Sequence, residues 1–477
     1  MARLTRIQCW VFLGAILYVP LVRAQDQGTD PGKNDSREQP VAPIAAVLAS
    51  GSTSDSAMNS TAEIRSTGED RRPLSGVQEQ TLGTNFGIRN FLVPSIHVAS
   101  QMATSSSASG YSRPTGLTYL LGTLDLNRVA ERSDLLLHYT GGAMLSTYLN
   151  SAVQDLEFSY TYKWPRWSLM VGDQTSYLSE SPFGFGGVGG LAFLNGGVSL
   201  PFLNPALDPN QTIPTIIVPR LSNTLVSQIE YRFSPRASWT GSGSYSMLNF
   251  LGAGYINSTE KALQTGYNYL LSPQSSIAAI YRYDVFRFTY LPQSIENHVA
   301  QLGYGRYITG RLSLHLAAGP SVELFRGFLT GSAKRLSWAM DSSLSYRLDR
   351  TTLLLSYAHL LTAGSGVLVG ARTSQVEAAM ERTLSPKWQA SASLGYANNR
   401  NLVHTAASLG QEQYNAWYAA VRFNRQLRPG TSFFVSYGAR LQATNAFICP
   451  AGNCGTNSIG HEISAGFNFG MRPIEFR

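Results

Sequence analysis

The sequence predicts an all-β fold, a transmembrane antiparallel β-barrel of about 18 strands, with roughly 16 as the fallback count. Three observations lead to this prediction. After residue 90, apolar and polar residues alternate over runs of about ten residues, the period of a strand with two different faces. Short turns join the runs in pairs, and the apolar face of a run begins and ends in Tyr, Trp or Phe. A sheet with hydrocarbon outside it can pair every backbone group only by closing on itself.

The composition favours a large sheet over helices. Of the 477 residues, 14% are charged and 43% are hydrophobic. The charged share is low for a globular protein, and Gly, Tyr, Ser and Thr take its place. The net charge is +8, but the basic residues are scattered through the strand runs and do not cluster on one segment. This scatter argues against nucleic acid as a partner.

Residues 1–24 have the pattern of a signal peptide. Arg3 and Arg6 precede the apolar run Cys9–Val22, and the small residues at positions 22 and 24 suit cleavage after Ala24. An uncleaved anchor is the alternative, although the apolar run is short for a membrane span. We therefore expect an exported protein.

Residues 25–88 are predicted to form a disordered periplasmic extension. They are rich in Ser, Thr, Gln, Asp, Gly and Pro, with VAPIAAVLA as an apolar island. Such a segment cannot bury enough apolar surface to offset the entropy of ordering. It is either a plain tether or a peptide that recruits a partner. Residues 89–477 form the predicted barrel.

The strand runs and turns alternate along the rest of the chain. In SPKWQASASLGYA, at 385–397, Trp388, Leu394 and Tyr396 share one face, while Ser391 and Ser393 lie on the other. The same period of two returns in the runs at 236–247, 311–319, 335–348 and 459–469. The longest connection runs from about 176 to 223. Eight short turns are predicted at Asn127–Arg132, Lys163–Arg166, Ser234–Arg236, Ser272–Gln274, Thr309–Arg311, Asp349–Thr351, Ser385–Lys387 and Arg425–Gly430.

Short turns on one rim, long loops on the other and aromatic residues at both ends of the apolar face resemble the outer-membrane barrels of Gram-negative bacteria. The resemblance is to this class, porin-like or exporter-like, and to no single family. It implies a location in the cell outer membrane, with outer-membrane lipid around the barrel and the short turns in the periplasm.

Alternation also predicts which charged residues face the lumen. Two interpretations stay open: mutually paired charges that brace a wide barrel, or opposed patches that set a transverse field in a pore. With Lys387 and Asp284 included, the predicted lumen-facing charges are equal numbers of bases and acids, so an anion-specific pore is not predicted. The other lumen-facing charges are Lys163, Arg232, Arg282, Arg335, Arg347, Arg422, Arg440, Asp155, Glu157, Glu230, Asp341, Glu377, Glu381 and Glu462.

No motif predicts an enzyme, a cofactor or a metal site. The glycines of GFGGVG at 184–189 match a dinucleotide-binding loop, but no helix pattern follows them. His138, His315 and His359 lie in strand runs with no Ser or pair of acids suited to catalysis nearby. Asp155 and Glu157, two residues apart, belong to the lumen charges on this interpretation.

Cys449 and Cys454 remain after removal of the signal peptide, in the sequence CPAGNC. Two cysteines so close together in an exported chain favour a small disulfide within one loop. Metal binding is the alternative, and it lacks ligands because only His461 is nearby in sequence.

The long connection at 176–223 is the third loop on the outer rim, and we expect it to form the constriction of a pore. General porins fold a segment into the lumen at this position, and the resemblance implies the same role for this connection. Its apolar residues need a surface to bury against, and its glycines would let the backbone pass close to the wall. The alternative is a cap or an extra hairpin above the membrane. The constriction candidates are Phe183, Phe185, Phe193 and Phe202.

The predicted function is a channel that passes small hydrophilic solutes or a polysaccharide by diffusion. Barrels of about 16 to 18 strands leave an aqueous lumen, whereas eight-stranded ones fill with side chains. The alternative is an assembly or secretion accessory that holds a periplasmic protein partner through residues 25–88.

Overall fold

A computed structural model describes the barrel of this protein. The chain divides into two units, Met1–Ile44 and Ala45–Arg477. All described residues belong to the second unit: 73–77, 90–107, 110–111, 115–146, 150–178, 212–213, 218–252, 254–289, 291–327, 333–402, 413–444 and 458–475.

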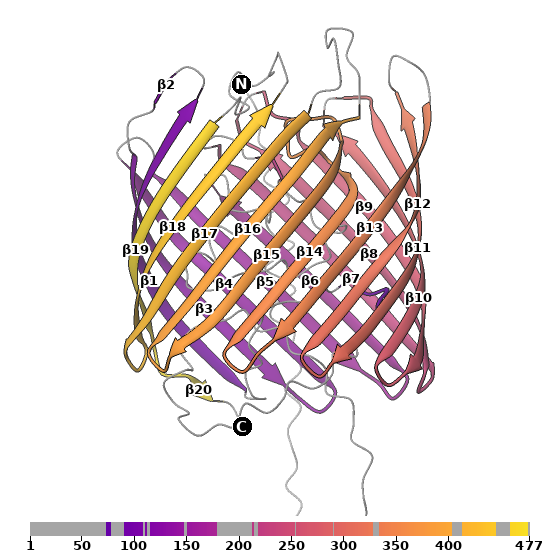
Figure 1. The fold of residues 1–477 in the computed structure, drawn as a ribbon, viewed down its shortest axis with the longest axis horizontal. Helices are drawn as coiled ribbons and strands as arrows, with labels where there is room; N and C mark the ends of the chain where they lie inside the picture. The colour runs from indigo at the N-terminus through magenta and orange to yellow at the C-terminus, as the bar shows by residue number, and fades with distance from the viewer. Residues whose placement is uncertain are drawn as a thin grey trace, which may run out of the picture. The chain divides into compact units, whose positions relative to one another are not determined.

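Eighteen long strands form one antiparallel sheet (Figure 1). Two further strands of two residues each, β2 (Gly110–Tyr111) and β20 (Ile474–Glu475), pair with the two ends of β1. The long strands are β1 (Phe91–Ser107), β3 (Thr115–Val129), β4 (Ser133–Ser146), β5 (Ser151–Lys163), β6 (Trp167–Leu178), β7 (Arg220–Ser234), β8 (Ala237–Phe250), β9 (Ser258–Ser272), β10 (Ser275–Phe288), β11 (Ser294–Thr309), β12 (Leu312–Arg326), β13 (Ala333–Arg347), β14 (Thr351–Thr362), β15 (Ala371–Ser385), β16 (Trp388–Asn401), β17 (Gln413–Arg428), β18 (Thr431–Thr444) and β19 (Ser458–Gly470).

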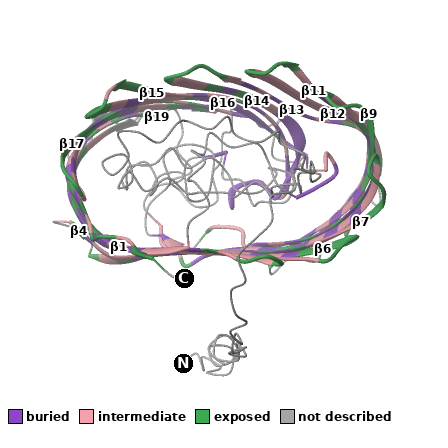
Figure 2. Ribbon diagram, turned by 90° about the horizontal axis from the view of Figure 1, so that it is seen from below, coloured by how far each residue is buried: buried purple, intermediate pink, exposed green. Residues whose placement is uncertain are grey.

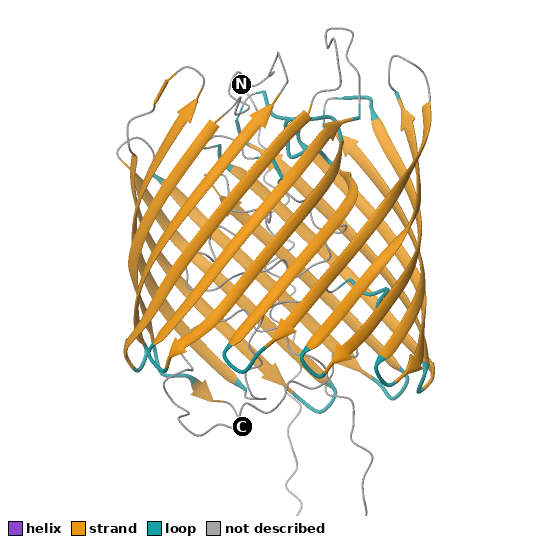
Figure 3. Ribbon diagram, in the orientation of Figure 1, coloured by secondary structure: helices purple, strands orange, loops and turns teal. Residues whose placement is uncertain are grey.

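The sheet closes into a barrel because β19 pairs back with β1, from Ser95↔Gly470 to Ser106↔Ile459. The described part consists of strands and loops (Figure 3). None of its residues form a helix long and apolar enough to cross a membrane. The predicted closed antiparallel barrel of eighteen strands is confirmed.

The eight predicted turns join successive strands at one rim, where β1 also begins and β19 ends. The turn after β5 is closed by a hydrogen bond from Trp164 N to Trp167 O at 2.7 Å. In the turn after β17, Gly430 has a φ of 77°, and a Cβ there would lie 2.4 Å from Gly470 O. Only glycine suits that position, because it tolerates positive φ and needs no room for a side chain.

The two faces of the sheet differ as the alternation predicts. Register partners share a face, and Gln228, Gln264 and Arg282 lie on one side, linked through β8. The other side carries large exposed apolar residues such as Leu302, which is 75% exposed, and Leu263, which is 63% exposed. Because exposed apolar surface of this extent requires an apolar solvent, that side faces lipid and the first side faces the lumen.

Aromatic residues follow both ends of the lipid-facing side. Near the short turns, the rings of Trp167 and Tyr231 lie 4.3 Å apart, and Phe233 continues the row. Near the other rim, the rings of Tyr396 and Trp417 lie 4.2 Å apart. These two girdles match the interfaces of a membrane-spanning barrel.

The outer end of the β14–β15 hairpin folds inward. The β13–β14 register ends at Met340↔His359, so Ala333–Ala339 have no β14 partner among the described residues. Beyond this point Leu361 and Ala363 pack against the inner side of β10–β12, in an apolar cluster that includes Phe286 and Phe325. Figure 2 shows a buried stretch inside the ring beside β13. The wall is therefore double-layered here.

Residues 73–77 contact the inner wall, and this differs from the disorder expected for 25–88. The physical reason is local: side-chain amides of the wall bind the backbone of Ser75 and Val77. Signal cleavage and the rest of the extension fall outside the described residues, so the predicted boundaries at 24 and 88 stay predictions.

Candidate functional site

The lumen face is the candidate site, and the registers place fifteen of the sixteen predicted charged residues on it, while Lys387 lies in the turn between β15 and β16. Lys163 and Glu157 share their face of β5 with Asp155, whose partner on β4 is the fully buried Thr140. Arg422 on β17 pairs with Ser391 on β16 and Ser436 on β18, and both serines face inward. Whether these charges act on a solute stays a prediction.

Acidic residues gather on β3–β5. Asp125, His138 and Glu157 are register neighbours across the three strands, and His138 Nδ1 contacts Asp125 Oδ1 at 2.5 Å. Asp155 lies next to them and is 2% exposed. Further toward the turns, Lys163 pairs with Asp134. We call Asp125, Asp134, Asp155 and Glu157 the acidic arc.

Basic residues gather on β17 and β18. Arg422 is 1% exposed, and its Cζ lies 3.7 Å from the centroid of the Phe434 ring. Arg440 lies beside Gly460, where a Cβ would come within 2.8 Å of the arginine Nε. Arg428, at the end of β17, lies beyond a register shift and pairs with Thr431, so it does not share the face of Arg422. The described residues of β17 and β18 include no acid, so Arg422 and Arg440 form a basic arc.

Some of the predicted charges are brought together as pairs. Arg282 Nε lies 3.0 Å from Asp284 Oδ2, and both side chains are almost fully buried. Arg232 Nε lies 3.5 Å from Glu230 Oε1. The two members of each pair are two residues apart on one strand. Such mutually paired charges fit the interpretation that the charges brace the barrel.

Other predicted charges have neutral or unpredicted partners. Tyr418 donates to Glu377 at 3.4 Å, and Gln101 donates to Glu462 at 2.9 Å. Gln389 donates to Glu381. The remaining three predicted charges contact other elements of the wall: Asp341 lies 3.4 Å from His315 Nδ1, Arg335 lies over the Phe325 ring at 5.6 Å, and Arg347 donates its backbone N–H to Arg311 O at 2.8 Å.

Two residues of the long connection between β6 and β7 contact the far wall. Thr212 donates its N–H to Ser365 Oγ at 3.0 Å and its hydroxyl to Asn399 Oδ1 at 2.5 Å, and Asn399 donates back to Thr212 O at 3.3 Å. Ile213 is 1% exposed and packs against Tyr414, in a cluster with residues of the β14–β15 hairpin. β15 lies half-way round the eighteen-strand ring from β6. Thr212 and Ile213 therefore lie against the wall opposite the end of β6.

Ser365 has an unusual backbone that suits this contact. Its φ is 54°, and it is the one non-glycine residue with positive φ in the described part of the chain. Its hydroxyl accepts from the N–H groups of both Thr212 and Ile213, the second at 3.4 Å. A non-glycine residue in the left-handed region is retained where its surroundings favour it, often at functional segments.

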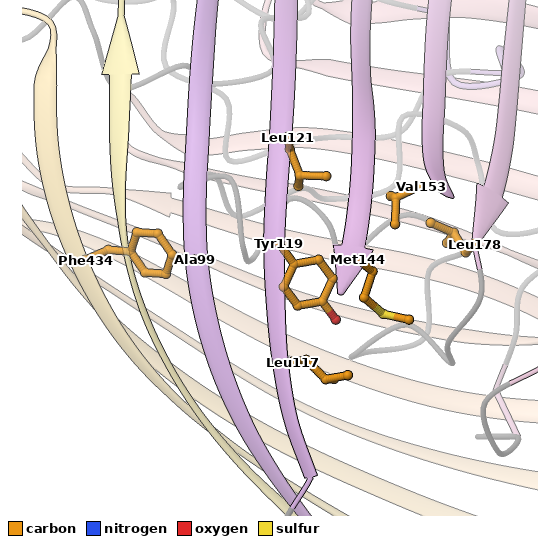
Figure 4. Packing of buried hydrophobic residues seen from close by; sticks show 8 residues of the cluster. All are labelled: Ala99, Leu117, Tyr119, Leu121, Met144, Val153, Leu178 and Phe434. Atoms are coloured by element: carbon orange, nitrogen blue, oxygen red, sulfur yellow. The ribbon is translucent and has the colours of Figure 1, made fainter. Parts of the chain in front are cut away.

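An apolar patch lies on the lumen face of β1 and β3–β6 (Figure 4). Tyr119 and Leu121 are each 1% exposed, and Met144 is fully buried. Phe434, under Arg422, belongs to the same cluster. An apolar surface inside an aqueous lumen needs a cover, and this patch is adjacent to the end of β6 where the long connection begins.

Several residues of the lumen were missed by the sequence pattern, although some had a signal. Asp125 lies five residues before the turn at 130–132 and His138 six residues after it, so a hairpin at this turn would have brought them close together. Arg372 donates to both oxygens of Glu323 at 2.7 and 2.8 Å, and that pair has no local signal because it depends on the inward-folded hairpin.

The constriction candidates Phe183, Phe185, Phe193 and Phe202 lie outside the described residues, as do Cys449 and Cys454. In the described ranges, no three His, Cys, Asp or Glu residues are placed to hold a metal ion.

No protein-family model matches the sequence, and no curated protein matches it. Solved structures of Pseudomonas outer-membrane proteins resemble the barrel. OccK2 (OpdF) of Pseudomonas aeruginosa in complex with glucuronate has a TM-score of 0.45 at 10% identity, covering 80% of this chain and 98% of that chain. A BenF-like porin from Pseudomonas fluorescens has a TM-score of 0.43 at 9% identity, covering 80% and 99%.

OpdL of Pseudomonas aeruginosa gives the same values as the BenF-like porin. Likeness this distant carries no information about the solute or the mechanism of this chain. The class that the fold itself defines is a closed transmembrane β-barrel of eighteen strands, with a polar and charged lumen face that Thr212 of an outer connection contacts.

Proposed function

We propose that the chain is an outer-membrane channel through which small hydrophilic solutes diffuse, with a constriction formed by the connection between β6 and β7. The observation that carries this proposal is the contact of Thr212 and Ile213 with the wall half-way round the ring. An external cap would not need to reach the lumen side of β15–β17. A ring of eighteen strands is wide enough to hold water around such a crossing segment.

The rest of the connection has a surface to pack on. The apolar patch of Leu117, Tyr119, Leu121 and Met144 faces the lumen close to Leu178, the last residue of β6. We propose that Phe183, Phe185, Phe193 and Phe202 cover this patch. This arrangement would bury the apolar residues of the connection and leave a narrowed polar passage beside the charged arcs.

The two arcs support a field near the wall in addition to bracing. The acidic arc on β3–β5 and the basic arc on β17 and β18 are neighbours on the wall, separated by β19 and β1, so the field between them runs along the wall and they are not opposed patches. Neutralising two of the four acids of the acidic arc with Asp155→Asn and Glu157→Gln should shift the reversal potential in a salt gradient toward anion preference. Asp349→Asn, in an exposed turn, is the matched control and should leave the potential unchanged. Equal shifts in both would leave only the bracing role.

The channel is tested with the purified mature protein in liposomes. Swelling with small sugars should be fast, and deletion of residues 184–218 should admit larger sugars than the parent does. A deletion variant that folds and inserts normally but keeps the size limit of the parent would remove the constriction. Absence of swelling for every solute would favour the accessory that holds a periplasmic partner.

A further inference from the structure

A five-residue stretch of the N-terminal region lies against the lumen wall. Pro73–Val77, with the sequence PLSGV, forms a turn in which Gly76 N donates to Pro73 O at 3.0 Å. Ser75 and Val77 are fully buried. The sequence predicts this stretch to be part of the disordered extension at 25–88, a tether or a recruiting peptide, and the channel proposal does not use it.

The wall binds the backbone of this stretch through amide side chains from two strands. Asn268 Oδ1 accepts from Ser75 N at 3.1 Å and from Ser75 Oγ at 3.0 Å, and Gln264 Nε2 donates to Ser75 O at 2.8 Å. Gln228 Oε1 accepts from Val77 N at 2.7 Å. Asn268 is itself oriented by donating to Thr240 Oγ1 at 3.0 Å. Main-chain groups bound in this way are the hallmark of a peptide-binding surface.

Apolar contacts flank these hydrogen bonds on both sides. Val77 is buried with Met170, Val226 and Ala262, which come from β6, β7 and β9. On the other side, Leu74 packs against a cluster of Ala278, Ile280 and Ala317 on β10 and β12. The stretch therefore runs around the wall from β12 toward β6, and Leu74 and Val77 contact separate apolar clusters.

The wall is also shaped for close approach of a backbone. A Cβ at Gly266 would lie 2.2 Å from Ser75 Cβ, and a Cβ at Gly305 would lie 2.8 Å from Leu74 Cδ2. A Cβ at Gly303 would meet Leu74 Cβ at 3.7 Å, which is ordinary contact. The absence of a side chain at Gly266 and Gly305 therefore makes room for Pro73–Val77.

We propose that this part of the lumen wall is a peptide-binding site whose resident ligand is Pro73–Val77 of the same chain, and that the docked stretch narrows the half of the lumen near the short turns. Asn268 lies four residues before the end of β9 at that rim, and Leu74 touches residues near the start of β10. The docking itself stands independently of the channel proposal. Its effect on conductance rests on that proposal.

A disulfide reports the docking directly. The 3.7 Å between Leu74 Cβ and a Cβ at Gly303 is within the usual range for a disulfide of about 3.5 to 4.5 Å. In full-length mature protein with Cys449→Ser and Cys454→Ser, the double variant Leu74→Cys and Gly303→Cys should cross-link almost completely. Leu74→Cys with Ser391→Cys, on the lumen face of β16 and five strands from Gly303, should not. A folded barrel with no Leu74–Gly303 cross-link, or equal cross-linking of both pairs, would overturn the proposal.

Glycine substitutions supply the second readout. Gly266→Ala should reduce the yield of that cross-link several-fold and raise the single-channel conductance. Gly305→Ala should act in the same direction. The matched control Gly122→Ala, where a Cβ meets nothing closer than 3.8 Å, should change neither. Unchanged cross-linking in Gly266→Ala would overturn the binding site. Reduced cross-linking with unchanged conductance would overturn the narrowing.

The failure of the channel proposal is distinguishable from the failure of this one. If no variant conducts, the channel is wrong, while the cross-link yield still decides whether Pro73–Val77 occupies the wall.

Discussion

The substitution Leu302→Arg tests the lipid-facing side at its centre. β11 has 16 residues, from Ser294 to Thr309, and Leu302 lies seven residues from the short-turn end. A strand rises about 3.3 Å per residue, and a tilt of about 40° leaves roughly 2.5 Å per residue along the membrane normal. Leu302 is then about 18 Å from one end of the strand and about 20 Å from the other. It lies near the middle of a hydrocarbon band of about 25 Å.

An arginine at this position would have no acidic neighbour on the adjoining strands. The register partners of Leu302 are Ala279 on β10 and Ala318 on β12. Arginine at the midplane of a barrel costs about 2 to 4 kcal/mol, which lowers the folding equilibrium constant by about 30- to 700-fold. The free energy of unfolding is measured by denaturant titration from lipid vesicles with tryptophan fluorescence.

Two controls separate the effect of charge from the effect of side-chain loss. Leu302→Ala removes apolar area without adding charge. Leu271→Arg places the same charge one residue from the end of β9, where the expected cost is about 0 to 1 kcal/mol. Equal costs for Leu302→Arg and Leu271→Arg would refute the assignment of depth and of the lipid-facing side.

Three further predictions follow from the lumen and its connections. Ser365→Ala removes the hydroxyl that accepts from Thr212 N and Ile213 N, so the β6–β7 connection should loosen and the single-channel conductance should rise. An unchanged conductance would contradict the proposal that Ser365 holds this connection in the lumen. Arg372→Met leaves the buried carboxylate of Glu323 uncompensated and should destabilise the barrel by about 3 to 5 kcal/mol, with recovery in the double variant that adds Glu323→Gln; no recovery would argue against the ion pair. Cys449 and Cys454 should be bonded in the mature protein, and removing the bond should barely change barrel stability because the ring is short; two free thiols in denatured, unreduced protein would contradict the bond.

The wall was predictable because each of its determinants is local. Trp388, Leu394 and Tyr396 are separated from one another by even numbers of residues. Their shared face therefore follows from the period of a strand alone. The turns follow from Pro and Gly at the reversals. Charged residues such as Arg282 and Glu157 were placed on a face by the same period, although their partners were not.

The interior was not predictable in the same way, because it depends on contacts between distant segments. Thr212 and Ser365 are 153 residues apart, and they meet only because the β14–β15 hairpin leaves the wall and folds inward. Ser75 and Asn268 are 193 residues apart, and the stretch around Ser75 has the composition of a disordered tail. Leu117, Tyr119 and Leu121 face the lumen although they are apolar, so they depart from the expectation of a polar inner face. They need other residues inside the barrel to cover them.

The central claim is an open path through the barrel, and the conductance of single molecules in planar bilayers tests it most directly. Purified, folded, mature protein should give steady open steps of uniform size, and the steps should be larger after deletion of residues 184–218. Bilayers that stay silent for both proteins, although both are shown to be folded and inserted, would contradict the claim.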